Sequence, residues 1–287
     1  MNKRLLVIII TYNAMKWIDR CFSSLRQSSV KSSVFVVDNG STDGTQAYLQ
    51  EKYPEVIFTQ SHKNLGFGRA NNIGLRYAID NNYDYVYLLN QDAWVMPDTF
   101  EKLISIMSLN KQFGIVSPLQ MNADMTKLDR NFNTLYLASK PTSVSGLVEV
   151  STIMAAHWML SISTIRKIGA FSPVFYHYTE DDNYVDRLHY HGLKCGVYEF
   201  AKAVHDREFR KDSLLKKADL EFKARVLVIS DPGDNLIRCL LTQPYRLLKS
   251  SSIYGIKRTL INTLKLISLY PKIIINRSVS KNEGAFL

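Results

Sequence analysis

Three short runs of apolar residues in the first third of the chain each end in polar side chains. The runs cover residues 5–10, 34–37 and 85–89, and they contain β-branched, aromatic and leucine side chains without a period of two. Such runs are typical of strands that are buried on both faces of a parallel sheet. Ligands of open α/β sheets bind outside the carboxyl ends of the strands, so the polar residues that follow are candidates for a ligand site.

Apolar positions with a helical period lie between these runs, which predicts an α/β fold. Residues 15–25 have such a stripe, and Asn13 is its predicted cap. A second helix is expected to begin near residues 41–43, and a third to cover 64–77. The same patterns predict a strand at 56–59, a helix with Asp98 and Glu101 as a capping box, strands at 113–117, 148–153 and 155–162, a loop at 121–145, and a helix from Ser163 to Gly169.

Four polar motifs follow the strands in a fixed order. They are Thr11-Tyr12-Asn13, the VDNGSTDGT segment at 37–45, Asn64-Leu65-Gly66-Phe67 with Asn71, and Asn90-Gln91-Asp92. In order and spacing they resemble the motifs of the family 2 glycosyltransferases, over roughly residues 4–210. The resemblance implies a GT-A fold, with a mixed sheet between helices, and a nucleoside diphosphate sugar donor. It implies donor contacts from Thr11, Tyr12, Asn13, Asp38, Asn39, Ser41, Asn64, Gly66, Phe67, Asn71, Asn90, Gln91 and Asp92.

Asp92 is the candidate metal ligand. It follows the apolar run at 85–89, where a carboxylate would hold a metal ion bound to phosphate, although a turn aspartate before Pro97 is the alternative. The resemblance implies Mg²⁺ or Mn²⁺ as cofactor. Asn90 stands where many relatives have a second acid, which predicts weaker metal binding.

A second acidic cluster, Glu180-Asp181-Asp182, begins a predicted helix. These acids can serve only to complement the helix dipole. However, Tyr176 and Tyr178 precede them, and aromatic walls would raise the pKa of a carboxyl group toward that of a general base. The resemblance implies that Asp181 is this base. It also implies acceptor-binding or supporting roles for Glu180, Asp182, Arg187, Tyr178 and Arg207, whereas Asn183 departs from the family pattern.

His205 follows an apolar stretch near the end of the resembling region. A histidine in this setting is more often a hydrogen-bonded core residue than a metal ligand. The resemblance favours a second metal ligand beside Asp92. We expect the other histidines to be structural.

The charge of the chain is concentrated at its end. The net charge is +10 over 287 residues, and residues 238–287 contain nine Lys or Arg and one acid. Apolar residues recur at a helical period over 253–267, beside Lys257, Arg258 and Lys265. Such a basic amphipathic helix suits an anionic membrane surface, and the alternative is packing on the chain's own body or on a second subunit. No stretch is long and apolar enough to predict a membrane span.

These observations predict a catalytic domain at 1–210, with a donor half at 1–117 and an acceptor half at 118–210, followed by a helical extension at 211–287. The three cysteines are widely separated, which argues against disulfides and favours a reducing cytoplasm. The short apolar run at 5–10 lacks the features of a signal peptide. We therefore expect a peripheral protein on the inner face of the cell membrane.

The resemblance implies an inverting transferase that moves one sugar, from dTDP-rhamnose or a UDP-hexose, to an acceptor such as a lipid-linked glycan. Two other functions are less consistent with the sequence. A nucleotidyltransferase of sugar phosphates would need a Gly-rich basic loop after its first strand, and residues 11–16 contain no glycine. A nucleic-acid binder would leave both acidic clusters unexplained. The processive enzymes of the family carry Gln-x-x-Arg-Trp after the base, and this chain has no tryptophan beyond Trp158.

Overall fold

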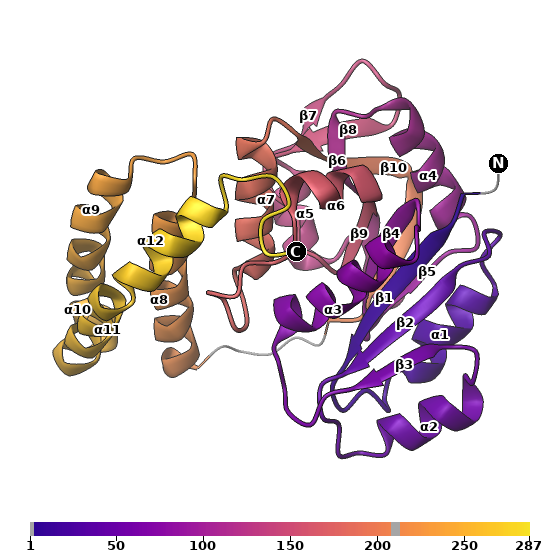
Figure 1. The fold of residues 1–287 in the computed structure, drawn as a ribbon, viewed down its shortest axis with the longest axis horizontal. Helices are drawn as coiled ribbons and strands as arrows, with labels where there is room; N and C mark the ends of the chain where they lie inside the picture. Colours follow the sequence, from indigo (N-terminus) through magenta and orange to yellow (C-terminus); the bar gives the residue numbers. More distant parts are fainter. Residues whose placement is uncertain (1–2, 208–212) are drawn as a thin grey trace.

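A mixed sheet of ten strands forms the centre of the computed structural model, which describes residues 3–207 and 213–287 (Figure 1). Along the sheet the strands lie in the order β3-β2-β1-β4-β9-β6-β10-β8-β7, and β5 pairs with β10. The strands are β1 (Leu5–Thr11), β2 (Ser33–Asp38), β3 (Ile57–Gln60), β4 (Tyr85–Asn90), β5 (Ala93–Val95), β6 (Phe113–Met121), β7 (Lys140–Pro141), β8 (Leu147–Val150), β9 (His157–Ser161) and β10 (Lys194–His205).

The three apolar runs are neighbouring parallel strands. In the register of the sheet, Thr11 at the end of β1 lies opposite Asp38 of β2, and Ile10 lies opposite Asn90 of β4. The polar residues that follow these strands therefore meet at one edge of the sheet, as predicted. Alternate residues of β1 belong to different core clusters, Leu5 and Ile9 to one and Leu6 to the other, which explains the absence of a period of two.

The predicted donor and acceptor halves share this sheet. β9 lies antiparallel between β4 and β6, and the predicted division between residues 117 and 118 falls inside β6. The predicted boundary between residues 210 and 211 lies outside the described residues.

Helices cover both faces of the sheet. α1, α2 and α4 contribute to the core cluster on one face, and α3, α6 and α7 to the cluster on the other. The helices are α1 (Ile18–Arg26), α2 (Thr45–Lys52), α3 (Phe67–Asp80), α4 (Thr99–Leu109), α5 (Arg130–Tyr136), α6 (Ile162–Ile168), α7 (Glu180–Tyr190), α8 (Leu214–Ser230), α9 (Leu236–Lys249), α10 (Ser251–Tyr254), α11 (Ile256–Ser268) and α12 (Tyr270–Val279).

Several predicted helix starts are wrong. α1 begins at Ile18 and not beside Asn13, which has a φ of 52°. The capping box at α4 does not form, because Asp98 pairs with Lys102 and Glu101 accepts a hydrogen bond from a serine hydroxyl instead. The serine that bonds Glu101 is Ser29, which is distant in sequence, and local patterns do not record such contacts.

Three other predictions need smaller corrections. α2 begins at Thr45, after Gly44, two to four residues later than expected. The hydroxyl of Ser161, not that of Ser163, caps α6 by accepting a hydrogen bond from the Thr164 N–H. The predicted loop at 121–145 contains α5 and β7.

Helices α8 to α12 pack around a separate cluster that includes Phe222, Ile229 and Leu266. The predicted helix at 253–267 is divided at Gly255, which has a φ of 84°. Pro271 lies in the first turn of α12, where proline is tolerated.

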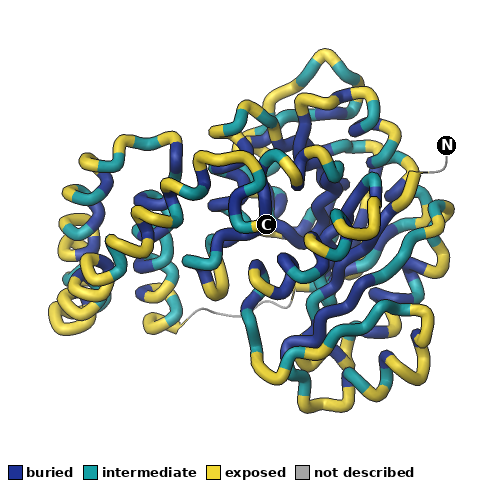
Figure 2. Tube along the Cα trace, viewed as in Figure 1, coloured by how far each residue is buried: buried dark blue, intermediate teal, exposed yellow. Residues whose placement is uncertain are grey.

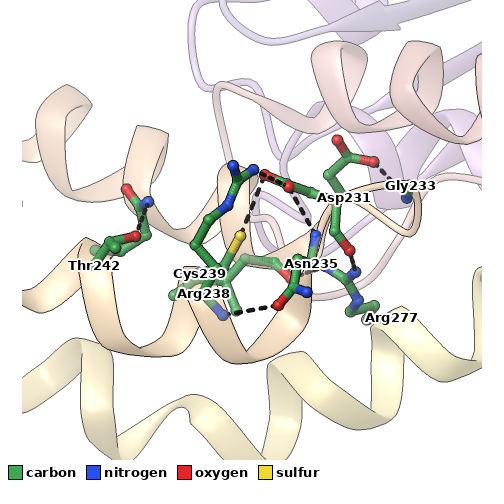
Figure 3. A network of polar contacts seen from close by, with 10 residues as sticks. Asp231, Gly233, Asn235, Arg238, Cys239, Thr242 and Arg277 are labelled. Carbon is green, nitrogen blue, oxygen red and sulfur yellow. Dashed lines mark hydrogen bonds and ion pairs between the residues drawn. The ribbon is translucent and has the colours of Figure 1, made fainter.

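The turn between α8 and α9 is held by a polar network (Figure 3). The Gly233 N–H donates to Asp231 Oδ1 over 2.8 Å, and the Asn235 side chain caps α9 by accepting from the Arg238 N–H over 2.9 Å. Arg277 of α12 is buried and donates to the carbonyl oxygens of Ile229 (2.8 Å) and Asp234. These bonds fix the orientation of α9 and α12 relative to α8.

The last residues of the chain pack against the turn that follows α6. The Ala170 N–H donates to the Ala285 carbonyl over 2.8 Å, and the Gly284 N–H donates to the Lys167 carbonyl over 3.0 Å. Between these contacts Gly169 has φ 88° and ψ −154°, a conformation that is essentially restricted to glycine. A Cβ atom at Gly169 would lie 1.8 Å from the Ala285 carbonyl oxygen.

We expect Gly169→Ala to lower the free energy of unfolding by about 3 kcal/mol, because backbone strain and the collision with the tail act together. Gly192→Ala is the matched control. Gly192 also follows a helix with a positive φ of 76°, but its Cβ would meet nothing within 4 Å, so strain alone should cost about 1 kcal/mol. Urea denaturation of both variants measures the difference, and equal losses would mean that the tail does not hold this turn.

Candidate active site

Asp38 shapes the turn after β2. Its carboxylate is fully buried and accepts five hydrogen bonds, from Thr11 Oγ1 (2.9 Å), the Gly40 and Ser41 N–H groups, Ser41 Oγ and Gln46 Nε2 (2.8 Å). The direct contact with a nucleobase or sugar hydroxyl that we predicted for Asp38 does not fit this geometry. Asp38 and the equally buried Thr11 instead hold the loops that follow β1 and β2 in place.

The loop after β1 is tied to two other candidate segments. The Gln91 side chain accepts from the Tyr12 N–H over 2.7 Å and donates to the Tyr12 carbonyl over 3.2 Å. Asn13 donates its N–H to Ser41 Oγ and accepts from the Thr42 N–H, each over 2.9 Å. These bonds leave the Tyr12 side chain 48% exposed, so its ring is accessible for stacking.

The segment after Asn64 packs against the chain that leads to the acidic helix. Asn64 accepts from the Gly66 N–H through its side chain (2.8 Å), and from the Tyr176 hydroxyl through its carbonyl (3.0 Å). Gly66 has a φ of 81°, and a Cβ there would lie 1.9 Å from the Tyr176 carbonyl oxygen. Asn39 bonds the same segment, at the Leu65 N–H and the Gly66 carbonyl. The loop at residues 64–66 and the segment before α7 therefore hold each other in position.

Phe67 and Asn71 belong to the packing of α3. The Phe67 ring lies edge-on to Phe171, with the ring centroids 5.9 Å apart. Asn71 is 1% exposed, and its amide donates to the Phe67 carbonyl within the helix over 3.0 Å. The predicted donor contact of Asn71 does not fit this buried position.

Asp92 and His205 come together from two paired strands. Ala93 of β5 lies opposite His205 of β10, and this places His205 Nε2 3.6 Å from Asp92 Oδ1. The Asp206 N–H also donates to the Asp92 carbonyl over 2.8 Å. Burial raises the pKa of Asp92, but His205 and the charge of Arg207 outweigh it and lower that pKa below its usual value. Asp92 is therefore an ionised carboxylate, with its side chain 27% exposed.

His157, the second buried histidine, is structural, as predicted. Its Nε2 lies 3.0 Å from the Val204 carbonyl and must donate, so its Nδ1 accepts from the Tyr87 hydroxyl over 2.8 Å. Burial and the neighbouring His205 lower the pKa of His157 to about 3. A neutral His157 adds no positive charge beside Asp92.

Asp92 and His205 can hold a divalent ion whose remaining ligands would be substrate oxygens. A carboxylate and an imidazole are ligands for Mn²⁺, and a carboxylate with phosphate oxygens is the usual set for Mg²⁺. Residues 3–207 and 213–287 contain no group of three or more His, Cys, Asp or Glu side chains arranged to hold a metal. Any metal at this site therefore needs ligands from the donor diphosphate or from water. The buried His205 Nδ1 has no hydrogen-bond partner among the same residues, so Asp92 is the side chain that orients the ring.

The second acidic cluster contains carboxyl groups with raised pKa values. Asp181 accepts from the Ala155 N–H (3.4 Å), and burial together with the negative charge of Asp182 raises its pKa to about 6. Asp182 accepts from Thr152 Oγ1 over 3.1 Å. Burial and the charge of Asp181 raise the pKa of Glu180 to about 7, and one oxygen of Glu180 is buried without a hydrogen-bond partner among the described residues.

A short segment, residues 154–156, joins the two acidic sites. The Asn90 N–H, two residues before Asp92, donates to the Ala156 carbonyl over 3.1 Å. The adjacent Ala155 N–H donates to the Asp181 carboxylate. This role could not be predicted from the residue types, because it is performed by backbone groups of alanine. Residues 155 and 156 therefore connect Asp181 with β4, the strand that precedes Asp92.

The tyrosines before α7 do not enclose Asp181, contrary to our prediction. Tyr176 is 54% exposed and Tyr178 is 40% exposed, so burial by the rest of the site raises the pKa. Tyr178 and Thr179 both have a φ of 67°, an unusual pair that marks a constrained entry to α7. Lys216 and Lys223 of α8 lie over the Tyr178 ring, at 5.5 and 5.1 Å from its centroid. The helical extension thus contributes cations beside the acidic helix, which the sequence motifs did not reveal.

Arg187 ties α7 to the end of α6 and the turn that follows it. It is fully buried, and its guanidinium donates to the Ile168 and Ala170 carbonyl oxygens, each over 2.7 Å. Burial lowers its pKa to about 10. The Phe286 ring of the chain's tail lies 5.1 Å from the guanidinium. Arg187 cannot touch an acceptor in this position, so of the two predicted roles the supporting one fits.

Two curated proteins are similar to part of this chain. Low-salt glycan biosynthesis hexosyltransferase Agl10 of Haloferax volcanii is 25% identical over 210 residues, which cover 70% of this chain and 66% of that protein. N-acetylglucosaminyl-diphospho-decaprenol L-rhamnosyltransferase of Mycobacterium tuberculosis is 30% identical over 130 residues, or 41% of each chain. The chain thus spans less than two thirds of the length of these relatives.

Solved structures show the same fold. The crystal structure of S. aureus TarS 1–349 has a TM-score of 0.61 at 15% identity, covering 97% of this chain and 83% of that one. The model of the family described as "Glycosyl transferase family 2" matches residues 6–164, which is more than half of the chain and includes β1 to β9, the donor loops and Asp92. Because this match covers more than half of the chain, the chain belongs to glycosyl transferase family 2, and its fold is of the GT-A type.

Proposed function

We propose that this enzyme transfers one sugar from a nucleoside diphosphate donor to an acceptor hydroxyl, with inversion at the anomeric carbon. One observation carries the proposal: Asp181, a carboxyl group with a raised pKa, is connected through residues 154–156 to the strand end that holds Asp92 and His205. This connection supports a proposal in which a proton acceptor and a binding site for the leaving diphosphate belong to one active site.

The donor is held at the edge of the sheet where β1, β2 and β4 end. In this proposal the exposed Tyr12 ring stacks on the nucleobase, while Asn13, Ser41 and Asn64 line the loops that hold the ribose. Asp92 and His205 would hold Mg²⁺ or Mn²⁺ there, and Arg207 adds a positive charge beside them. The bound ion neutralises negative charge that develops on the leaving group.

The acceptor approaches from the side of α7. Its hydroxyl oxygen attacks the anomeric carbon, the bond from that carbon to the diphosphate oxygen breaks, and the hydroxyl proton passes to Asp181. A pKa of about 6 leaves Asp181 mostly ionised at neutral pH while making it a stronger base than an ordinary aspartate. Attack opposite the leaving group inverts the configuration.

The acceptor we propose is a lipid-linked glycan on the cytoplasmic face of a bacterial membrane, and the donor is dTDP-rhamnose or a UDP-hexose. The support is the 30% identity to a rhamnosyltransferase whose name includes a diphospho-decaprenol acceptor, together with the hexosyltransferase relative. A single transfer is expected because the Gln-x-x-Arg-Trp motif is absent from the sequence after Asp181.

Thermal unfolding with added nucleotides tests the donor site. UDP or dTDP at a hundred times its dissociation constant should stabilise the protein by about 2.7 kcal/mol in the presence of Mg²⁺ or Mn²⁺, and less with a chelator. ADP serves as the control nucleotide. A protein that none of these nucleotides stabilises would contradict the donor site. Release of pyrophosphate from UTP or dTTP with a sugar phosphate would favour a nucleotidyltransferase, and a product ladder would contradict single transfer.

A further inference from the structure

Two helices of the C-terminal extension turn apolar residues outward and polar residues inward. α9 buries Cys239, Gln243 and Leu247, and α11 buries Thr259, Thr263 and Leu266. The exposed sides carry larger apolar side chains, including Leu241 at 72% exposed and Ile256 at 77%. In a helix on the surface of a globular protein the reverse is expected. We define the outer apolar face by Ile237, Leu241, Leu248, Ile256, Leu260 and Leu264.

The polar side chains that point inward have hydrogen-bond partners, and the bond of Gln243 joins α9 to α8. Gln243 accepts from Arg225 of α8 over 3.1 Å. The Thr259 and Thr263 hydroxyls donate to carbonyl oxygens of their own helix, over 3.0 and 2.8 Å. Buried polar groups that are satisfied in this way stabilise the observed orientation. The outer apolar face therefore follows from the way in which α9 and α11 pack on the rest of the chain. It leaves a large apolar surface in contact with solvent.

This face lies at the end of the molecule away from the parallel strands (Figure 1). Exposed residues gather on α9, α10 and α11 at this end (Figure 2). α8 packs against both α9 and the acidic helix α7, so one helix connects the face with the acceptor side of the active site. None of the helices in the described part of the chain is long and apolar enough to cross a membrane.

The charges beside the face are almost all positive. Residues 238–287 contain nine Lys or Arg and one acid, Glu283, and each of the basic residues except the buried Arg277 is exposed. Lys257, Arg258 and Lys265 all belong to α11. Two copies of the chain that met through this face would bring like charges together with hardly an acid to pair them. An anionic surface supplies the opposite charge.

We propose that α9, α10 and α11 bind the surface of a bilayer that contains anionic lipids. The outer apolar face enters the boundary between headgroups and acyl chains, and the flanking lysines and arginines pair with the headgroups. This proposal deepens the proposed function, and rests on it only in that a lipid-linked acceptor would be met at the same surface.

Vesicle flotation of the full chain tests the proposal. We expect the protein to float with vesicles of phosphatidylglycerol and phosphatidylcholine, and at least tenfold less with phosphatidylcholine alone or in 0.5 M salt. Replacing Ile256, Leu260 and Leu264 together by glutamine should reduce flotation at least tenfold. The matched control replaces Leu109 and Leu137, which are 79% and 76% exposed on the catalytic domain, and it should float like the natural chain.

A second variant keeps the test decisive if the triple variant unfolds. Lys257→Gln with Arg258→Gln changes only exposed side chains and should lower binding to anionic vesicles severalfold. Equal flotation of the natural chain with both kinds of vesicle, or no flotation with either, would overturn the proposal. So would a dimer in sedimentation that the triple variant abolishes. Nucleotide stabilisation is measured on the same samples without vesicles, so loss of flotation alone leaves the donor site standing.

Discussion

Asp181→Asn is expected to lower turnover by about 10²- to 10⁴-fold and to leave nucleotide affinity within about twofold. The amide keeps the size of the carboxyl group but cannot accept the acceptor's proton. It can still accept the hydrogen bond from the Ala155 N–H, so the neighbouring strand end should keep its place. Calorimetric titration of UDP or dTDP and steady-state rates with a purified acceptor measure the two effects separately.

Asp182→Asn is the matched control. Adjacent residues of a helix point about 100° apart, and the Asp182 carboxylate is already bonded to Thr152. Its loss should reduce turnover far less than the loss of Asp181. A larger loss from Asp182→Asn than from Asp181→Asn would mean that the base is misassigned by one residue.

The pH profile provides a second reading of the same site. Turnover should fall about tenfold per pH unit below pH 6, since protonated Asp181 cannot accept a proton. Asp182→Asn removes a negative charge that raises the pKa of Asp181, so the acid limb should move to lower pH. Interacting carboxyl groups share their titration, and the observed midpoint therefore belongs to the cluster.

The raised pKa values also have a consequence for stability. Asp181 and Glu180 hold protons more tightly in the folded state than in the unfolded chain. Between about pH 4 and pH 7 the folded state therefore binds more protons, so this cluster lowers stability as the pH rises through that window. Keeping several carboxyl groups close together thus lowers the folding stability, and it also makes Asp181 a stronger base.

The parallel half of the sheet could be predicted because its strands are buried on both faces. Residues 5–10, 34–37 and 85–89 are apolar without alternation, and few other environments favour that pattern. The insertion of β9 between β4 and β6 had no such signal. β9 pairs with β4 across about 70 residues of chain, and no local pattern reports which distant strand will be its neighbour.

The site residues divide in the same way. The position of Asp92 at the end of β4 followed from the strand, and the resemblance supplied His205 and Asp181. The roles of Asp38 and Asn71 did not follow from either, because they depend on which donors surround each side chain in three dimensions. Asp38 carries the residue type expected of a ligand-binding group, yet its hydrogen-bonding capacity is taken up by the turn.

The C-terminal helices show that a helical period does not determine which side of a helix is buried. A stripe of apolar residues with a helical period predicts a helix, and the direction in which the stripe points comes from the packing. In α11 the threonines point inward and Ile256 and Leu260 point outward. The sequence therefore suggested either a membrane surface or packing on the body of the enzyme, and the structure shows the stripe exposed.

Asp92→Asn is expected to remove the effect of Mg²⁺ or Mn²⁺ on UDP or dTDP affinity and to lower turnover at least about 10²-fold. The change keeps the shape of the side chain but removes the negative charge from the pair with His205. A neutral amide and one imidazole would bind a hard divalent cation weakly. Nucleotide titration with metal and with a chelator measures the loss directly, without any acceptor.

Gln91→Ala separates this effect from simple disturbance of the loop. Gln91 holds the Tyr12 backbone through two hydrogen bonds, so its truncation should weaken nucleotide binding whether or not metal is present. The ratio of affinities with and without metal should stay that of the natural chain. In Asp92→Asn the same ratio should fall to about one. If Asp92→Asn kept the natural ratio, Asp92 would be a turn residue before Pro97, and the metal, if any, would bind elsewhere.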